Sequence, residues 1–294
     1  MKSIICIGEV LWDILPEGKK LGGAPLNVAL RAQSLGHNTS MISSIGNDGI
    51  GVELAEKILG HGGTLAHIQV TQDYATSEVL VELDKHGTAS YEIRMPCAWD
   101  NITLQEQDIE AVKHSDALIY GSLVARSDVS RLTLFSLLEQ ASYKVFDVNL
   151  RPPHYTPERI ISLMKAADFV KFNDEELNEI CTHLGKDDKE LEACIRFMSE
   201  QTDTNQICVT LGKDGAVLFY NHAFYYNPGY KVTVADTVGA GDSFLASIIS
   251  QLLNGLNPQD AIDYACAVGS IVASKNGANP EISDAEVRAM IAGA

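Results

Sequence analysis

The chain has 294 residues, of which 46% are hydrophobic and 21% charged, and its formal net charge is −17. This length and hydrophobic fraction suit one large α/β domain, which we expect to span residues 1–294. The negative charge argues against a nucleic-acid partner, because a phosphate backbone would be repelled. No run of about 18 apolar residues occurs and the amino terminus lacks the shape of a cleavable signal, so we expect no membrane partner and a cytoplasmic location.

Cysteine usage also bears on the cellular compartment. The six cysteines are scattered, none are paired at metal-ligand spacing, and most lie inside apolar segments. This pattern favours buried free thiols in a reducing environment over disulfides or a zinc site. The residues are Cys6, Cys97, Cys181, Cys194, Cys208 and Cys266.

An apolar segment and a glycine-rich turn open the chain. Residues 2–15 predict a nearly continuous strand, and Asp13 interrupts its apolar pattern near the end. Ligands bind beyond strand ends in open α/β sheets, so Asp13 is either a ligand contact or a solvated turn acid. Gly22 and Gly23 precede the next helical pattern and would permit close approach to the backbone. Asn27 could bond a hydroxyl group or simply be solvated at the helix start.

A hairpin is predicted next. Residues 76–95 alternate in places between apolar and polar character on either side of a turn at 84–87. Together with residues of about 13–21, they could form a small sheet hinged on the main domain. Arg94 would lie on this sheet, where it either reaches a ligand or stays solvated.

Polar residues follow a buried strand in the middle of the chain. Residues 144–150 predict a core strand, and Asp147, Asn149 and Arg151 lie near its end. Polar groups at a buried strand end need partners, which indicates a ligand site or an internal Asp147–Arg151 ion pair.

Two later strands lead into turns that could line a ligand. Residues 168–172 predict a strand that opens into Asn173 and Glu176, which also fit an ordinary helix start. The next strand leads into a glycine-bounded turn that carries Lys213. This lysine could contact a phosphate or lie exposed in the turn.

The turn at Gly239-Ala240-Gly241 has the composition of an anion cradle. Residues 230–235 predict a strand before it, and residues 244–253 show helical spacing after it. Glycines at a helix start let backbone N–H groups converge, and the helix dipole adds positive potential. Asp242 would lie at the rim, either as a proton acceptor for a nucleophile or as an acidic helix cap.

The longer stretch Asp-Thr-Val-Gly-Ala-Gly-Asp-Ser-Phe, at 236–244, closely resembles the carboxy-terminal signature of the ribokinase-like (PfkB) family of sugar and nucleoside kinases. Residues 21–29 resemble the amino-terminal half of the same family's pattern. The matched motifs run in order from Asp13 to Gly277, nearly the whole chain. The resemblance implies a three-layer α/β/α ribokinase-like domain with a central, mainly parallel sheet and a small β-sheet lid.

The resemblance also implies a set of residue roles. It makes Asp242 the catalytic base and Gly239, Ala240 and Gly241 the anion hole. The implied sugar contacts are Asp13, Gly22, Gly23, Asn27, Tyr91, Arg94 and Arg151. The implied nucleotide contacts are Asn173, Glu176, Thr210, Gly212, Lys213, Gly215, Asn276 and Gly277. Glu176 would meet Mg²⁺ through water, and carbonyls near Asp236 and Val238 could bind a monovalent cation such as K⁺.

The expected reaction is transfer of the γ-phosphoryl group of ATP to a hydroxyl of a monosaccharide. Residues 23–27 together with residues 146–151 look most like the fructokinase branch. A 2-keto-3-deoxygluconate kinase is the alternative, ahead of a ribokinase or nucleoside kinase. A non-catalytic sugar or nucleotide sensor is the alternative from another class. The chain lacks a Walker-A sequence, which excludes a P-loop kinase, and lids of this family often supply a homodimer contact.

Overall fold

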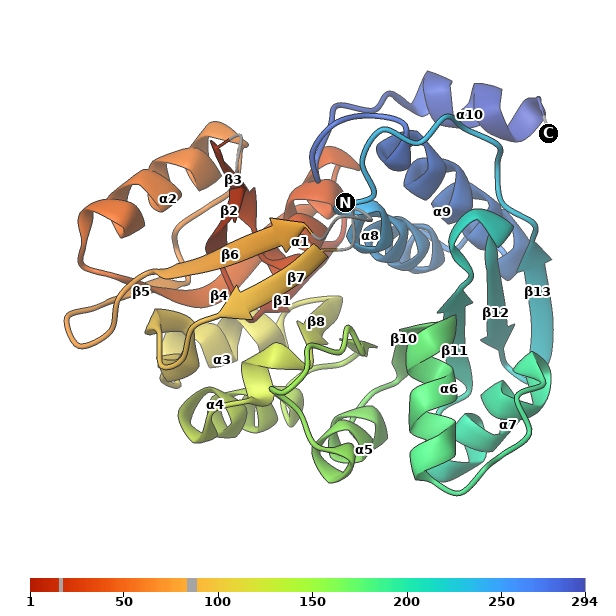
Figure 1. Ribbon diagram of the computed structural model, residues 1–294, viewed down its shortest axis with the longest axis horizontal. Helices are drawn as coiled ribbons and strands as arrows, with labels where there is room; N and C mark the ends of the chain where they lie inside the picture. The colour runs from red at the N-terminus through yellow and green to blue at the C-terminus, as the bar shows by residue number, and fades with distance from the viewer. Residues whose placement is uncertain (16–17, 84–88, 294) are drawn as a thin grey trace.

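The central layer of the computed structural model is a nine-stranded sheet (Figure 1). The structure describes residues 1–15, 18–83 and 89–293. The strands are β1 (Ser3–Ile7), β4 (Asn38–Gly46), β5 (Ile68–Thr71), β8 (Ala117–Gly121), β9 (Lys144–Asp147), β10 (Phe169–Asn173), β11 (Gln206–Thr210), β12 (Ala216–Tyr220) and β13 (Ala223–Asn227). Their order is β13-β12-β11-β10-β9-β8-β1-β4-β5. Neighbours are parallel except at β12, which is antiparallel to β11 and β13.

Helices cover both faces of this sheet (Figure 1). One face is packed by α1 (Ala24–Ser34), α2 (Gly49–Gly60), α8 (Ala240–Leu253) and α9 (Pro258–Ala273), and α10 (Asp284–Ala292) packs on α9. The other is packed by α3 (Glu106–Lys113), α4 (Asp128–Leu138), α5 (Pro157–Lys165), α6 (Asp174–His183) and α7 (Leu191–Thr202). Three 3₁₀ turns are η1 (Ala98–Asn101), η2 (Leu123–Ala125) and η3 (Gly212–Asp214). The predicted three-layer α/β/α architecture is confirmed.

A separate, four-stranded sheet stands beside the main one. Its strands are β2 (Leu11–Leu15), β3 (Gly18–Gly22), β6 (Ser77–Leu83) and β7 (Ala89–Ile93), in the order β3-β2-β6-β7. β6 and β7 pair antiparallel, as predicted, whereas their predicted turn at 84–87 lies outside the described residues. The small second sheet expected from the sequence is therefore present.

Two strand predictions are wrong. Residues 2–15 form β1 and β2 in different sheets, because the chain leaves the central sheet at Gly8, whose φ is 148°. Asp13 therefore lies inside the small sheet and not at the end of a central strand. Residues 230–235 form no strand; they run as irregular chain, and the Ala235 amide donates to the Ala273 carbonyl at the end of α9 (2.8 Å).

Burial on both faces explains the apolar composition of the strands. Successive residues of β9 belong to different cores, with Val145 packed against the α8 side and Phe146 against the α4 side. A strand buried on both faces reads as a continuous apolar run, as observed here. All six cysteines are buried free thiols, as predicted. Among the described residues, no helix combines the length and hydropathy needed to cross a bilayer.

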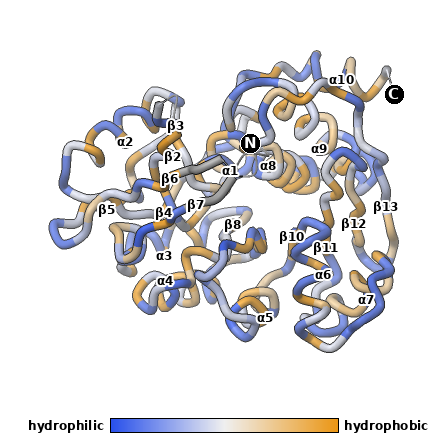
Figure 2. Tube along the Cα trace, viewed as in Figure 1, coloured by the Kyte–Doolittle hydropathy of each residue, from blue (hydrophilic) through white to orange (hydrophobic). Residues whose placement is uncertain are grey.

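Close packing of α8 against α9 depends on small side chains. The hydrophobic residues along α8 are visible in Figure 2, and α9 lies directly beside this helix. A Cβ added at Gly269 of α9 would come within 3.5 Å of the Ala240 carbonyl and 3.6 Å of Phe244 Cβ. Small residues in the 261–274 segment therefore bring the two helices together and hold the start of α8 in place.

A buried ion pair fixes the segment that follows β7. Arg126 donates through Nε and Nη2 to the two carboxylate oxygens of Asp100 (2.7 and 2.8 Å), and also to the Arg94 carbonyl (2.7 Å). Asp100 also accepts from the Cys97 amide (2.9 Å), and the guanidinium stacks on Trp99 at 3.9 Å. The two charged side chains are 1% and 2% exposed, so each depends on the other for compensation.

Replacement of Asp100 by Ala should destabilise the fold by about 3–5 kcal/mol, because the Arg126 charge would remain buried and unpaired. Asp128→Ala is the matched control, since its bond to Arg131 (2.6 Å) is at the surface and its side chain is 83% exposed. The control should cost less than about 1 kcal/mol. Urea unfolding followed by circular dichroism measures both, and equal losses would contradict the assignment.

Candidate active site

The strand order reverses between β1 and β8, which marks a topological switch point. Ligands of open α/β sheets bind beyond the carboxyl ends of the strands at such a point. Glu9 follows β1, Asp147 ends β9, and Asn173 ends β10. The starts of α1 and α8 meet at the same edge, because Asn27 Nδ2 of α1 donates to Asp242 Oδ2 of α8 (2.8 Å). This edge is the candidate active site.

The start of α8 is shaped by one glycine. Gly239 caps the helix in the left-handed region, with a φ of 75°. A Cβ there would lie 2.5 Å from Ala278 Cα, so the loop after α9 packs directly on this glycine. The Ala240 amide makes a long bond to the Thr237 carbonyl (3.3 Å). The amides of a first helical turn lack intrahelical partners, so they and the helix dipole favour an anion at this end.

Asp242 lies in the first turn of α8 and is held from α1. Its Oδ2 accepts from Asn27, whose own Oδ1 accepts from Asn279 Nδ2 (2.9 Å). Burial raises the pKa of Asp242 to about 6; nearby Asp147 adds to the rise, whereas the Asn27 bond and the charge of Lys171 oppose it. A carboxylate with this pKa is ionised at neutral pH and can still accept a proton.

Two further carboxyl groups face the same space. Burial raises the pKa of Glu9 to about 7 and that of Asp13 to about 6. In both cases the Arg151 charge lowers the pKa and the Asp242 charge raises it. Glu9 Oε1 accepts from the Ala24 amide (3.3 Å), and its buried Oε2 has no hydrogen-bond partner among the described residues. Arg151 is therefore the positive charge that three carboxyl groups share.

Gly22 and Gly23 make room for this cluster. A Cβ at Gly22 would collide with the carboxylate of Asp13 on the neighbouring strand, because β2 and β3 are paired there. Gly23 has a φ of 110°, and a Cβ there would collide with the Glu9 carbonyl. Both glycines thus allow the small sheet to approach the end of β1 closely.

A buried lysine lies beneath the start of α8. Lys171 Nζ donates to Asp147 Oδ1 (2.8 Å), and the two side chains are 8% and 6% exposed. Burial alone would lower the pKa of Lys171, but the carboxylates of Asp147, Glu176 and Asp242 outweigh burial and raise it. The lysine therefore stays charged, and Asp147 has a partner that the sequence did not indicate.

Asn173 and Glu176 form a reciprocal helix cap. Asn173 Oδ1 accepts from the Glu176 amide and Glu176 Oε2 accepts from the Asn173 amide, both at 2.8 Å. Glu176 Oε1 accepts from the Leu150 amide (2.9 Å). Because backbone amides engage both carboxylate oxygens, this glutamate fits a water-mediated metal contact better than direct ligation. No cluster of three or more metal-binding side chains occurs in the described part of the chain.

The β11–β12 turn lies beside this cap. Thr210 pairs in register with Asn173, and its hydroxyl donates to the Phe172 carbonyl (3.3 Å). Gly212 and Gly215 have φ values of 59° and 87°, as a tight turn requires. Lys213 is 88% exposed and bonds the neighbouring Asp214 (3.3 Å), so in this state it points to solvent and not to the candidate site.

Asp236 organises the loops on either side of the α8 start. Its carboxylate accepts from the Val238 amide (3.0 Å) and from the Gly277 amide (3.2 Å). Lys20 of the small sheet lies 3.6 Å from the same carboxylate. Asn276 is exposed on the loop that carries Gly277.

One predicted contact beside the small sheet does not reach the cluster in this structure. Arg94 follows β7 and its side chain is exposed, while its carbonyl accepts from Arg126 Nη2 (2.7 Å). Tyr91 lies on β7, but its side chain falls outside the part that the structure describes.

Comparison with known proteins now identifies the family. The profile of the pfkB family carbohydrate kinases matches residues 3–285. The chain belongs to the pfkB carbohydrate kinase family. It is 27% identical to the fructokinase of Escherichia coli over 292 residues, which cover 92% of this chain and 93% of that one.

Solved structures of sugar kinases share the fold. An uncharacterized sugar kinase of Pyrococcus horikoshii superimposes with a TM-score of 0.84 at 27% identity, over 98% of this chain and 99% of that one, and it has also been solved in complex with ATP. A double mutant of the fructokinase of Vibrio cholerae O395, bound to fructose, ADP and potassium, superimposes with a TM-score of 0.85 at 23% identity, over 99% of this chain and 98% of that one.

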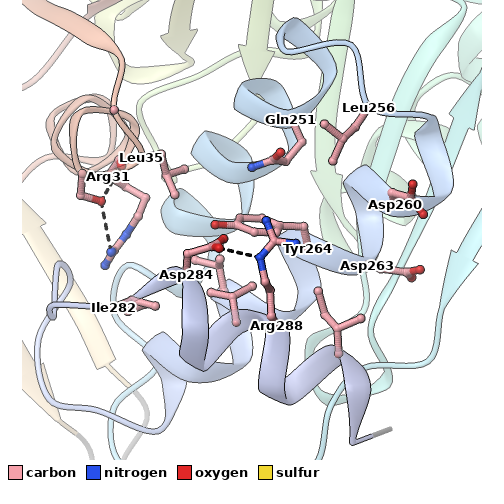
Figure 3. A pocket seen from close by; sticks show the side chains of 15 residues that line it. Arg31, Leu35, Gln251, Leu256, Asp260, Asp263, Tyr264, Ile282, Asp284 and Arg288 are labelled. Atoms are coloured by element: carbon pink, nitrogen blue, oxygen red, sulfur yellow. Dashed lines mark hydrogen bonds and ion pairs between the residues drawn. The ribbon is translucent and has the colours of Figure 1, made fainter. Parts of the chain in front are cut away.

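This pfkB kinase also has a cavity away from the candidate site. About 710 Å³ in volume, it lies between α1, α8, α9 and α10 and is lined by Arg31, Tyr264 and Arg288 (Figure 3). Arg288 Nε donates to Asp284 one turn earlier on α10 (2.5 Å), at the wall of this cavity. Of the described residues that line this cavity, none is a predicted site residue.

Sequence reasoning missed three residues of the site: Glu9, Lys171 and Asn279. Lys171 and Glu9 carried a usable signal, because each is a lone charge within or directly after an apolar strand. Asn279 lies in an irregular loop, where composition gives no indication of which side chain turns inward.

Gly239→Ala should destabilise the protein by about 1–3 kcal/mol or more, because a side chain in the left-handed region is strained and its Cβ meets Ala278. Gly241→Ala is the matched control, because the nearest atom to its Cβ is Lys171 Nζ at an ordinary 3.7 Å. Alanine inside a helix is favoured, so the control should be neutral or slightly stabilised. Urea unfolding of the two variants compares them directly; an equally destabilised control would refute the packing argument.

Proposed function

We propose that this carbohydrate kinase phosphorylates a neutral monosaccharide, fructose, with ATP as the donor. The observation that carries the proposal is the position of Asp242, whose carboxylate lies in the first turn of α8. A proton acceptor and an anion-binding helix start thus face one place, as phosphoryl transfer to a hydroxyl requires. Relatives named fructokinase support the choice of sugar.

In the proposed reaction, Asp242 accepts the proton of the attacking sugar hydroxyl. The hydroxyl oxygen bonds to the γ-phosphorus of ATP, and the bond from that phosphorus to the bridging oxygen of ADP breaks. The amides of Gly239, Ala240 and Gly241 stabilise the charge on the transferring group. The Asn27 bond to Oδ2 orients the carboxylate so that Oδ1 can face the hydroxyl.

The sugar would lie between the small sheet and the start of α1. Asp13 would accept hydrogen bonds from hydroxyls, and Gly22 and Gly23 would let the ring approach the backbone. Arg151 would complete the contact from the end of β9. Arg94, which follows β7, would have to turn inward to take part, and Tyr91 of β7 is proposed as a further contact.

The nucleotide would lie beyond the ends of β10 and β11. Its proposed contacts are Asn173, Glu176, Thr210, Gly212, Lys213, Gly215, Asn276 and Gly277. Mg²⁺ supplies charge neutralisation of phosphate oxygens, and Glu176 would bond water on the ion, since its two oxygens already accept amide bonds. A K⁺ ion near Asp236 and Val238 would share the Asp236 carboxylate with Lys20.

The charge of the cluster favours a neutral sugar over 2-keto-3-deoxygluconate. An acid sugar would bring a carboxylate beside Glu9, Asp13 and Asp242, which already share the charge of Arg151. Hydroxyl groups instead donate to these carboxylates without adding negative charge. Ribose and nucleosides are also neutral, so they belong in the test.

The four-stranded sheet is proposed to act as a lid over the sugar. It carries Asp13 and contacts the α8 loop through Lys20 and Asp236. A homodimer formed through this sheet is proposed as well, because sheet edges at β3 and β7 offer unpaired backbone groups to a second copy.

ATP consumption with a panel of fructose, 2-keto-3-deoxygluconate, ribose and adenosine tests the substrate. Fructose should give the highest kcat/KM, and a protein that does not phosphorylate fructose would refute the choice.

Asp242→Asn should lower kcat by about 10²–10⁴-fold while fructose binding, measured by calorimetry, survives. Turnover retained in this variant would remove Asp242 from its proposed role.

The fall of the kinase rate constant at acid pH, the acid limb of its pH profile, should report the pKa of Asp242. The base works as a carboxylate, so kcat/KM, which reports the free enzyme, should be full above its pKa of about 6 and fall tenfold per pH unit below it. Asn27→Leu removes a bond that lowers this pKa, so the limb should move to higher pH. Asn279→Ala breaks the other bond of Asn27 and should leave the limb in place. An unmoved limb in Asn27→Leu would assign it to Asp13 or Glu9.

A further inference from the structure

A lysine occupies a position where the packing of the sheet calls for an apolar side chain. Phe169 of β10 is fully buried in the core beneath α8, and Lys171 follows it two residues later on the same face of the strand. Its register partners, Asp147 of β9 and Cys208 of β11, are buried as well. The ammonium is therefore enclosed by the sheet below and by α8 above.

The ammonium points at the turn that would receive the phosphoryl group. Its Nζ lies 3.7 Å from the position that a Cβ of Gly241 would take. One of its three N–H groups goes to Asp147 Oδ1 (2.8 Å). The negative groups around it come from three other elements: Asp147 from β9, Glu176 from α6, and Asp242 from α8.

The anion hole formed by the amides of Gly239–Gly241 therefore lies beside more negative than positive side chains. A terminal phosphate that enters it would meet three carboxylates within a poorly solvated space, where Coulomb repulsion is weakly screened. The helix dipole opposes only part of that repulsion. A fixed cation directly below the cradle would offset the remainder and would need no movement when the phosphate arrives.

We propose that Lys171 is the built-in counter-charge of the α8 anion hole, positioned by Asp147 so that the terminal phosphate of ATP can be held and transferred. The assignment rests on the proposed kinase function and adds a residue to it. It assigns Lys171 to the phosphoryl end of the site and not to the sugar end. The alternative is that Lys171 and Asp147 form a buried ion pair with a structural role only.

Three variants separate these roles: Lys171→Met, Asp147→Asn, and the two combined. Lys171→Met alone leaves Asp147 buried and unpaired, so it is the variant most prone to misfolding. The combined variant removes both charges, keeps the side-chain sizes similar, and preserves the net charge of the protein. Asp147→Asn retains the ammonium beside the cradle. Thermal unfolding of each variant establishes that it is folded before kinetics are measured.

The combined variant should lose about a hundredfold in kcat and bind the Mg²⁺ complex of adenylyl-imidodiphosphate at least tenfold more weakly, with the KM for fructose little changed. Asp147→Asn should lose clearly less, because its lysine remains. If both variants lose activity equally, the lysine only completes an ion pair and the proposal is overturned. A larger rise in the KM for fructose than for ATP would overturn it too.

Calorimetry with the ATP analogue keeps this test apart from the substrate proposal. A wild-type protein that binds the analogue tightly but phosphorylates no fructose would refute the choice of sugar only. In that case the difference in analogue affinity between the combined variant and Asp147→Asn still decides the role of Lys171. Equal affinities would overturn it.

Discussion

The balance of buried charge at the amino end of α8 is the constraint on which the rest of the site depends. Glu9, Asp13 and Asp242 crowd around Arg151, and burial raises the pKa of each of the three carboxyl groups. Their mutual repulsion costs folding free energy, and it persists because the scaffold fixes the strand ends that carry them. Hydroxyl donors and a metal-bearing nucleotide are the ligands that relieve such repulsion. The electrostatics of the site therefore agree with the proposed substrates, a neutral sugar and a metal-bound nucleotide.

The second constraint is close packing at the start of α8, where the loop after α9 and the small sheet meet. Gly239 lets the loop after α9 press on α8, and Asp236 ties that loop to the turn through the Gly277 and Val238 amides. Lys20 brings the small sheet to the same carboxylate. A movement of the small sheet would therefore be transmitted to the start of α8 through the Lys20–Asp236 ion pair and the two amide bonds to Asp236. If the small sheet acts as the proposed lid, this attachment would couple sugar enclosure to the shape of the phosphoryl site.

The sequence predicted the layered fold because strands buried on both faces read as apolar runs, and helical spacing separates them. It placed Asp242 at a helix start and Asn27 near a ligand, and these two residues are bonded to each other. It failed where the chain changes sheet: the apolar pattern of residues 2–15 was interpreted as one strand, although Gly8, whose φ is 148°, marks the point where the chain leaves the central sheet. It also failed at 230–235, where β-branched residues favour a strand but the chain is irregular and the Ala235 amide donates to the Ala273 carbonyl. Lys171 was missed because its partner is 24 residues away in sequence and meets it only through strand register.

The proposed sugar contacts and the proposed nucleotide contacts come from different parts of the fold. Side chains expected at the sugar come from the small sheet and from the starts of α1 and α8, whereas those expected at the nucleotide come from the ends of β10 and β11 and the loop after α9. Asp242 is the residue at the junction, with Asn27 on one side and the charge of Lys171 on the other. Because each ligand changes the charge around it, the pKa of a base at this junction depends on both ligands. Under this proposal, changes in sugar specificity would fall on the small sheet, the start of α1 and Arg151, while the start of α8 and the lysine below it can remain constant.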